Sequence, residues 1–367
     1  MASEPASTTA ATETATEHVC LPFSPGPKQA QLLRALKEIP RYLFRVHASN
    51  TSGQTSSTEV VSRTALLGRP SAEQDIFAMP SRDAADMLNC HLRGWPRDSD
   101  NLMSWTSSLL FALVYALYRS LPDKDGFRNE MSDIRIYVLD TKNMPAGAFM
   151  SDMALIDTFV GKDSENVKNL FYMRRLRRDT QYNFGEYLCQ GKLSIAEHST
   201  STTLQDLINH GLFKLCPEMA EPNENSELAK RVCRFRTGCF SSPAQTTRSE
   251  VRSALILAQG CFGEVWALPL TAAFLSLRRR ARNDIVIINA FHANFSDNEL
   301  KEHELGTLKT FYHDRHPEVQ QFANTVQDIH SDHCARALDS IIATTMSLSI
   351  SSPSAIGLPT QPSSVNA

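Results

Sequence analysis

The local sequence pattern changes at about residue 202, and this change constrains the fold more than any other feature. Before it, short β-branched and aromatic segments such as YLFRVH at 42–47 and IRIYVLD at 134–140 alternate with Ser- and Gly-rich stretches. After it, apolar residues recur every three to four positions, which is typical of amphipathic helices. We therefore predict an α+β fold, with a sheet domain at 40–198 and a mainly helical region at 199–346.

Both ends of the chain lack this patterning. Residues 1–27 are rich in Ala, Thr, Ser and Glu and end in a proline cluster, and residues 347–367 are rich in Ser and Pro. Segments with so few large apolar side chains do not offset the entropy that ordering costs. We predict that 1–27 and 347–367 are disordered tails, and that 1–27 and 350–367 are dispensable for folding.

The charge balance and the apolar runs exclude several classes of function. The chain has 37 Lys+Arg against 40 Asp+Glu, a formal net charge of -3, so no overall positive field attracts nucleic acids or anionic membranes. The apolar runs at 109–118 and 267–275 are shorter than the roughly 18 residues of a membrane helix. The eight cysteines form no C-x-x-C pair, and the first residues contain no apolar signal segment. We expect a cytoplasmic or nuclear protein without membrane contact, and the oligomeric state stays open.

Four clusters are interpreted as surface features. The basic runs at 172–178 and 278–282 contain too few aromatic residues for a single-stranded nucleic-acid site, so nucleic-acid binding is disfavoured. The His-containing clusters at 313–316 and 330–334 lack the spacing of zinc ligands. No metal site is expected.

Three polar features fall in predicted strands or at strand-to-helix junctions. An arginine inside an apolar strand needs a partner, and one interpretation is structural: it pairs with an acid or a carbonyl, while the hydroxyl groups cap a helix. The features are Arg45 in YLFRVH, the hydroxyl residues Ser104, Thr106 and Ser107 before LLFALVYALYR, and Glu186 in NFGEYLCQGKL.

The chain resembles the ADP-ribosyltransferase superfamily, in its branch named for arginine, serine and glutamate. The resemblance rests on three segments in this order: YLFRV, SWTSSLLFALVYALYR and NFGEYLCQGKLSI. The phrases Ser-Trp-Thr-Ser-Ser-Leu and Glu-Tyr-Leu are similar to an uncharacterised fungal domain family of that superfamily. The resemblance covers residues 40–198. It implies an ADP-ribosyltransferase-like split β-sheet with one pocket for nicotinamide adenine dinucleotide (NAD).

The resemblance also implies a reaction and a role for each residue. NAD is the expected substrate, consumed by ADP-ribosyl transfer to an unknown protein or small-molecule acceptor, or by hydrolysis. Glu186 is expected to be the catalytic carboxylate, because cleavage of the nicotinamide bond leaves an oxocarbenium-like sugar that a carboxylate stabilises. Arg45 is expected to clamp the cofactor. Ser104, Thr106 and Ser107 are expected to help bind the cofactor. Thr106 and Ser107 would do so by orienting Arg45 and Glu186 or by touching the ribose.

Two positions depart from the family pattern. Trp105 stands where the Ser-Thr-Ser segment begins, so Thr106 and Ser107 match its second and third members and Ser104 lies one place early. Phe184 precedes Glu186 by two residues, where relatives that modify arginine have Glu or Gln, and a phenyl ring cannot position an acceptor. Arginine modification is therefore disfavoured. The alternative function is a catalytically silent module for ligand sensing or protein interaction.

Overall fold

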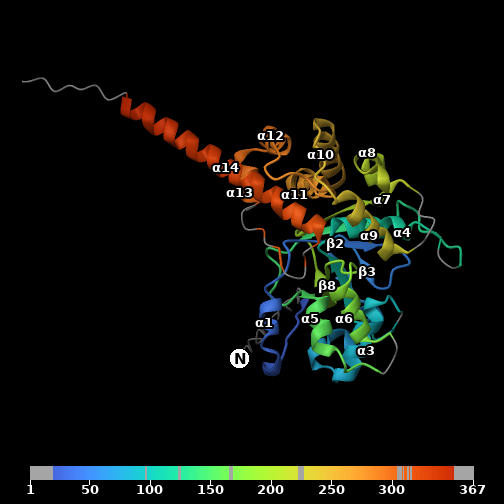
Figure 1. Ribbon diagram of the computed structural model, residues 1–367. Helices are drawn as coiled ribbons and strands as arrows, with labels where there is room; N and C mark the ends of the chain where they lie inside the picture. Colours follow the sequence, from blue (N-terminus) through green and yellow to red (C-terminus); the bar gives the residue numbers. More distant parts are fainter. Residues whose placement is uncertain are drawn as a thin grey trace, which may run out of the picture.

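The computed structural model describes residues 20–350 except 96, 123–124, 165–167, 222–226, 304–307, 309, 312–313 and 315. Within these residues, a curled antiparallel sheet is packed against helices (Figure 1). All the described strands end at or before Thr203, and the described elements after it are helices. The α+β prediction is confirmed.

The strands are short and the helices lie mostly in the second half. The strands are β1 (Cys20–Leu21), β2 (Tyr42–His47), β3 (Gln54–Thr55), β4 (Glu59–Val61), β5 (Leu102–Thr106), β6 (Arg135–Asp140), β7 (Met150–Ser151), β8 (Glu186–Ser194) and β9 (Ser199–Thr203). The helices are α1 (Leu32–Ala35), α2 (Arg63–Leu66), α3 (Ser81–Leu92), α4 (Leu109–Arg119), α5 (Asp152–Phe159), α6 (Leu170–Asp179), α7 (Leu204–Asn209), α8 (Leu212–Leu215), α9 (Leu228–Cys239), α10 (Arg248–Phe262), α11 (Glu264–Leu275), α12 (Ile285–Asn294), α13 (Asp297–Glu302) and α14 (Pro317–Ile350). Short 3₁₀ helices lie at Pro27–Gln29, Pro70–Glu73, Ile76–Ala78 and Pro217–Met219.

Near the centre of the sheet, strands β2 and β5 pair through very few of the described residues, and we call this place the central joint. The strand order in the described residues is β3-β4-β8-β5-β2-β6-β9, and β1 and β7 also pair with β8. Strands β2 and β6 pair along their whole length, whereas β2 and β5 are joined only through Phe44 and Thr106 among the described residues. Strands β2 and β5 therefore separate on one side of this pair, and side chains can enter the gap.

Helices cover one face of the sheet on both sides of this joint. The β2–β6 half packs with α4 and the C-terminal helices, and its core includes Phe44, Val138, Leu113, Leu257 and Phe274. The β5–β8 half packs with α3 and α5, around Leu102, Leu188, Leu88 and Met153. The opposite face has its own core, with Leu43, Trp105, Tyr137 and Tyr187. The C-terminal helical region thus shares a core with the sheet.

The N-terminal tail prediction is wrong for residues 20–27. Strand β1 pairs with β8, and the Phe23 side chain is only 2% exposed. The amide of Phe23 donates to the carbonyl of Gly147 at 2.8 Å. A single aromatic residue among prolines gives no local periodicity, so only a tertiary contact reveals its burial. The rest of the predicted tail, 1–19, lies outside the described residues.

Two other boundaries differ from the prediction. Ser199–Thr203 is strand β9, which pairs with β6, although the polar sequence STSTT has no apolar alternation. The predicted helical region therefore begins with a strand. Helix α14 continues to Ile350, so the prediction of a disordered tail from 347 is wrong for 347–350, and 351–367 lies outside the described residues.

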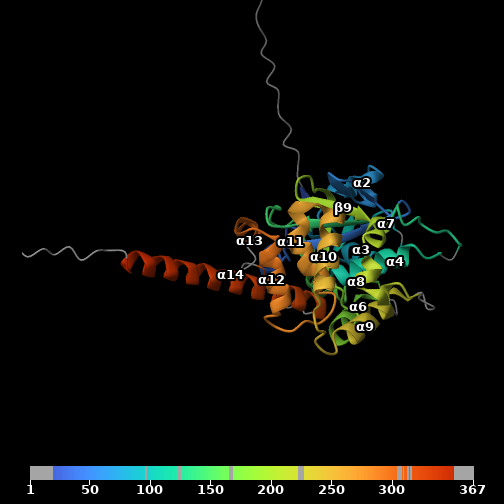
Figure 2. The same ribbon diagram turned by 90° about the horizontal axis from the view of Figure 1, so that it is seen from above.

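Helix α14 extends far from the body of the molecule (Figures 1 and 2). Its first half packs against α11 and α12, where Val326 and Ile329 are fully buried. The described side chains from Cys334 onward are exposed. None of the helices in the described part of the chain is long and apolar enough to cross a membrane.

Candidate functional site

The strand registers show which predicted site residues share a face of the sheet. Phe44 pairs with Thr106, and Thr106 pairs with Glu186. Residues paired across antiparallel strands point the same way, and neighbours along a strand point opposite ways. Ser104, Thr106 and Glu186 therefore lie on one face, and the side chain of Arg45 leaves the sheet on the other. The structure does not place Arg45 and Glu186 on one face, contrary to the prediction.

Ser104 and Glu186 form the centre of the candidate site. Ser104 Oγ donates to Glu186 Oε1 at 2.6 Å, across the paired strands β5 and β8. The other carboxylate oxygen, Oε2, accepts from Nη2 of Arg177 at 2.7 Å. The Glu186 side chain remains 17% exposed. The hydroxyl that lies one place early in the family pattern is thus the one that holds the carboxylate.

Arg177 of α6 links Glu186 to a second acid. Its side chain is 7% exposed, and Nη1 lies 2.9 Å from Oδ2 of the buried Asp152. Burial raises the pKa of Asp152, Arg177 lowers it and Glu186 raises it, with a net value of about 7. Arg177 belongs to the basic run at 172–178, for which we predict a surface position, and this prediction is wrong for Arg177. Arg177 is spaced four residues from the apolar Met173 and seven from Leu170, which places it on the inner face of α6. This spacing is the sequence signal that indicates a buried arginine.

His91 of α3 extends the network on the other side of Ser104. Its Nδ1 lies 2.8 Å from Asp100 Oδ2, and its Nε2 lies 2.8 Å from Ser104 Oγ. The Ser104 hydroxyl gives its proton to Glu186, so its oxygen accepts from His91, and the Asp100 carboxylate accepts from the other ring nitrogen. Both contacts together require an imidazolium.

The electrostatics agree with a charged His91. Burial lowers the pKa of His91, but Asp100 and Glu186 raise it more, and the net pKa is raised. A serine nucleophile needs a histidine that accepts its proton. Ser104 therefore positions Glu186 and is not itself an activated nucleophile.

Arg45 contacts the same strand through the backbone. It is 6% exposed, its Nε donates to Thr55 Oγ1 at 3.0 Å, and its Nη1 donates to the carbonyl of Ser104 at 2.7 Å. Within the described residues no carboxylate pairs with it. Burial lowers the pKa of the guanidinium. Arg45 thus supports β5 at the gap beside β2, and reaches Glu186 only through Ser104.

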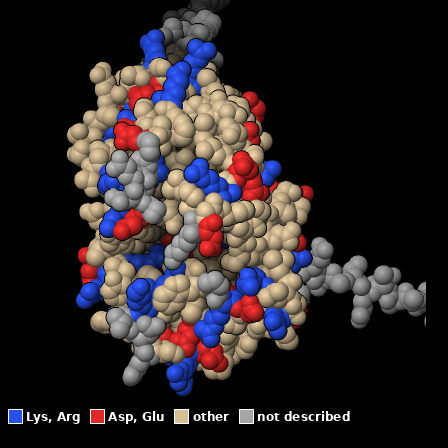
Figure 3. Space-filling view, turned by 90° about the vertical axis from the view of Figure 1, so that its right-hand side faces the viewer, with Lys and Arg blue, Asp and Glu red and all other residues tan. Residues whose placement is uncertain are grey.

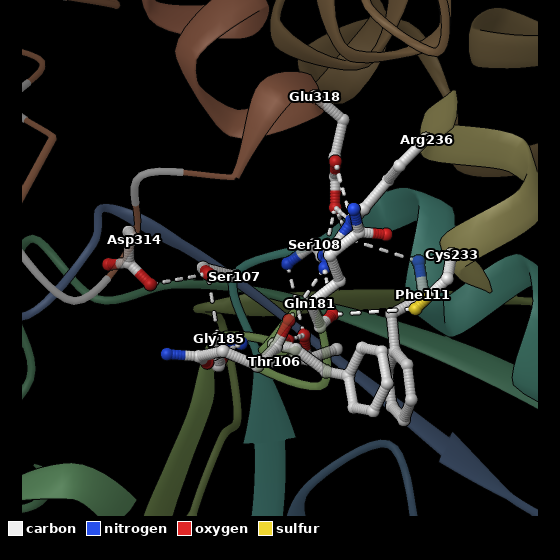
Figure 4. Close-up of polar contacts among 12 residues, drawn as sticks. Thr106, Ser107, Ser108, Phe111, Gln181, Gly185, Cys233, Arg236, Asp314 and Glu318 are labelled. Atoms are coloured by element: carbon white, nitrogen blue, oxygen red, sulfur yellow. Dashed lines mark hydrogen bonds and ion pairs between the residues drawn. The ribbon is translucent and has the colours of Figure 1, made fainter. Parts of the chain in front are cut away.

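The hydroxyl residues after Ser104 hold the end of β5 in place (Figure 4). The hydroxyl groups of Thr106, Ser107 and Ser108 each donate a hydrogen bond to another part of the chain, so none of them is free to donate to a cofactor. Ser108 also caps α4, and it accepts from the amide of Phe111. The contacts are Thr106 Oγ1 to the carbonyl of Phe184 at 2.6 Å, Ser107 Oγ to Asp314 Oδ1 at 2.7 Å, and Ser108 Oγ to Glu318 Oε1 at 2.6 Å.

Two buried carboxylates from the C-terminal region complete this junction (Figure 4). Asp314 accepts from Ser107 and from the Tyr187 hydroxyl, and burial raises its pKa to about 6. Glu318 pairs with Arg236 of α9 at 2.6 Å. Burial raises the pKa of Glu318, but Arg236 and its hydrogen bonds lower it more. The prediction that 313–316 is a surface cluster is wrong for Asp314, which is 1% exposed. Local pattern does not mark either acid as buried, because their partners lie far away in the chain.

Trp105 and Phe184 serve packing. Trp105 is 1% exposed and meets the ring of Phe149 edge-on, with 6.0 Å between centroids. Phe184 stacks on Phe111 at 4.9 Å. Trp105 is thus a core residue, and the hydroxyl that contacts Glu186 comes from Ser104 on the other face of the sheet.

Acidic side chains neutralise the basic runs. Figure 3 shows Lys and Arg interspersed with Asp and Glu on the face that it displays. The ion pairs join Arg174 and Arg178 to Asp157, Arg278 to Glu218, Arg280 to Glu250, and Arg282 to Asp328.

Two cavities lie away from the Glu186 network. One of about 330 Å³ is lined by residues at 36–41 and 141–149 with Leu308 and Phe311. A narrow apolar one of about 50 Å³ lies between α4, α11 and α14. Neither lining includes Arg45 or Glu186.

These features define an α+β protein with a polar network beside the central joint of its sheet. A family model described as a domain of unknown function (DUF7587) matches residues 38–204. The match includes strands β2 to β9 and all five predicted site residues, and it ends at residue 204, beyond the predicted boundary at 198. No curated protein and no solved structure matches the chain.

Proposed function

We propose that the protein binds NAD beside Glu186 and consumes it, by ADP-ribosyl transfer to an acceptor or by hydrolysis. The observation that supports this proposal is the 2.6 Å hydrogen bond from Ser104 to Glu186. It joins the strand that carries Ser104 to the strand that carries Glu186, as the ADP-ribosyltransferase resemblance implies. The single pair that joins β2 to β5 likewise supports an ADP-ribosyltransferase-like split sheet.

The chemistry needs a carboxylate that is fixed in advance. When the bond between the ribose C1′ and the nicotinamide nitrogen breaks, its electron pair leaves with nicotinamide and positive charge develops on the sugar. A positioned carboxylate stabilises that charge. Ser104 and Arg177 hold the two oxygens of Glu186 before any substrate arrives, so little reorganisation remains for the reaction.

The geometry assigns Arg45 a different role from the one the resemblance implies. Its guanidinium holds the Ser104 carbonyl instead of facing the Glu186 carboxylate. We assign it to positioning β5, and through β5 the Ser104 hydroxyl. Arg177 is the guanidinium on the Glu186 side, where it holds Oε2 of the carboxylate.

A second candidate, the catalytically silent module, also has an observation in its favour. Both oxygens of Glu186 are bonded to protein groups, and the two cavities described above lie elsewhere. A carboxylate used in this way contributes to folding and needs no substrate. This candidate predicts binding of a ligand or partner without NAD turnover.

Nicotinamide release from NAD, measured with the full chain, tests the proposal. We expect release by the wild type and a loss of about 100-fold or more in Glu186→Gln, because the stabilised charge exists only in the transition state. Calorimetry with NAD should give similar affinities for both proteins. Glu59→Gln is the matched control, since Glu59 lies in the same sheet and pairs with Lys192 at the surface. It should release nicotinamide at the wild-type rate.

Three other results have clear meanings. Equal rates for Glu186→Gln and the wild type would remove Glu186 from the reaction. Binding of NAD without release by either protein would select the silent module. Absence of both binding and release would exclude NAD as the ligand.

A further inference from the structure

A cluster of ligand-type side chains lies far from Glu186 in the sequence, where three helices meet. His292 comes from the end of α12, Asp297 from the start of α13 and His333 from the middle of α14. One ligand atom of each lies within 4.8 Å of the other two. We propose that these residues bind a divalent transition-metal ion of the Zn²⁺ type, independently of the function proposed for Glu186.

The residue types fit zinc better than the alkaline-earth ions. Imidazole nitrogen and carboxylate oxygen are common zinc ligands, whereas Ca²⁺ and Mg²⁺ need mostly oxygen. In a tetrahedral site with bonds of about 2.0–2.2 Å, ligand atoms are about 3.3–3.6 Å apart. The three atoms, which lie within 4.8 Å of one another, therefore need to approach by at most about 1.5 Å. Asp297 is free to make this movement, because its side chain is 77% exposed.

The two imidazoles are already arranged side by side. Their rings stack with 6.0 Å between centroids and an interplanar angle of 23°. The His292 side chain is 14% exposed and that of His333 is 10% exposed. Two neutral rings in this arrangement can share a cation, whereas two imidazolium rings would repel each other.

A second carboxylate supports the first ligand. Asp332 Oδ2 lies 2.8 Å from Nε2 of His292, and it also accepts from Nε of Arg336 at 2.6 Å. A carboxylate behind a ligating histidine fixes the ring and increases its basicity, and such contacts are regular partners of metal-bound histidine. Asp332 thus orients His292 while Asp297 provides the carboxylate ligand.

No local sequence pattern marks this site, because its ligands come from three separate helices. Within 330–334, the spacing of His330 and His333 is unlike that of a zinc motif, and His330 instead lies beside Cys334, 3.6 Å from its Sγ. Without a metal, the same residues form two His–Asp contacts, His292 with Asp332 at 2.8 Å and His333 with Asp297 at 3.5 Å. A measurement of metal binding therefore decides whether these residues form a metal site or only link the helices through His–Asp contacts.

Zinc titration of the full chain, freed of metal by a chelator, tests the proposal. We expect one equivalent of Zn²⁺ to bind in calorimetry and to raise the thermal midpoint, because the ion joins α12 and α13 to α14. Co²⁺ should give the intense visible absorption of a tetrahedral site. His333→Ala should abolish binding, and Asp297→Asn should weaken it by about 10-fold or more.

Two controls separate metal binding from misfolding and from nearby residues. Asp297 is mostly exposed, so its amide variant keeps the fold, and its thermal midpoint without metal should equal that of the wild type. His330→Ala, on the same helix but outside the cluster, should bind zinc like the wild type. Wild-type affinity in Asp297→Asn and His333→Ala, loss of binding in His330→Ala, or no zinc binding by the wild type would each overturn the assignment.

Discussion

Gly185, which directly precedes Glu186, cannot be replaced by a residue with a side chain without strain. Its φ is +64°, and an added Cβ would lie 2.1 Å from Ser107 Oγ. Its carbonyl also accepts from the amide of Ser107 at 2.9 Å, so the close approach is part of the strand pairing. The left-handed backbone and the contact each exclude a side chain.

We predict that Gly185→Ala lowers the free energy of unfolding by about 2 kcal/mol or more, measured by urea denaturation. The matched control is Gly238→Ala on α9, where an added Cβ meets no atom within 4 Å. Because alanine favours a helix interior by about 1 kcal/mol over glycine, this control should be neutral or stabilising. Equal losses in the two variants would show that Gly185 is not constrained in this way.

His316 makes the same junction sensitive to acid. Burial and the nearby Arg236 lower its pKa, Glu318 opposes them, and the net pKa is about 4. The unfolded chain takes up this proton near pH 6.5, well before the folded protein does. The contribution of His316 to stability is therefore full above about pH 6.5 and is lost as the pH falls towards 4.

We predict that His316→Gln reduces the pH dependence of unfolding by about 3 kcal/mol between pH 6.5 and 4. Urea denaturation of both proteins across this range measures the difference. Asp314 titrates in both, so its effect largely cancels in the comparison. Parallel pH profiles would show that folding does not lower the pKa of His316.

At the scale of elements, local pattern predicted β2 well and β1 not at all. Alternating apolar residues marked Tyr42–His47, and the structure gives the same bounds. Strand β1 has two residues, and only its pairing with β8 and the burial of Phe23 define its place. Residues of this kind contribute to the fold through contacts that no local window contains.

We predict that Phe23→Ala costs about 3–5 kcal/mol of stability, because the ring leaves a cavity beside Phe77 and Ile76. Leu33→Ala on the nearby α1 is the control, since Leu33 is 53% exposed and should cost little. Thermal denaturation compares the two. A small shift for both would restore the prediction that the segment before residue 28 is dispensable.

The candidate site shows the same limit of sequence reasoning. Glu186 and Ser104 were found because each lies in a short phrase with a recognisable neighbour. His91 and Arg177 were missed because they lie on helices, and their role depends on how α3 and α6 pack on β5 and β8. The resemblance implies one pocket for Arg45 and Glu186, whereas the register of β2, β5 and β8 puts their side chains on opposite faces. Strand register is a property of pairing, and local alternation does not reveal it.

At the scale of the whole molecule, the N-terminal sheet and the C-terminal helices depend on each other. Asp314 and Glu318 lie beyond the end of the family match at residue 204, yet they accept from Ser107 and Ser108 inside it. The buried ends of these contacts are ionisable groups, which are costly to leave without partners. The segment matched by the family model, without the C-terminal helices, would leave the Ser107 and Ser108 hydroxyls without these two partners.

The length of α14 has a consequence for its internal motion. A 34-residue helix spans about 50 Å, and its outer part reaches beyond the body (Figure 2). Leu338, Ile341 and Met346 are 57%, 63% and 62% exposed there, so the packing that stabilises most helices is missing. Its Ser, Thr and Ile residues are also weak helix formers.

Amide hydrogen exchange should therefore vary steeply along one unbroken helix. Near Val326 and Ile329, where the helix is buried, we expect opening to require almost global unfolding. Beyond Leu338, exchange should approach that of a free peptide, as mass spectrometry of peptic fragments can measure. Uniform protection would contradict this gradient. With the gradient, the free energy of opening falls from one end of α14 to the other while its hydrogen-bond ladder stays continuous.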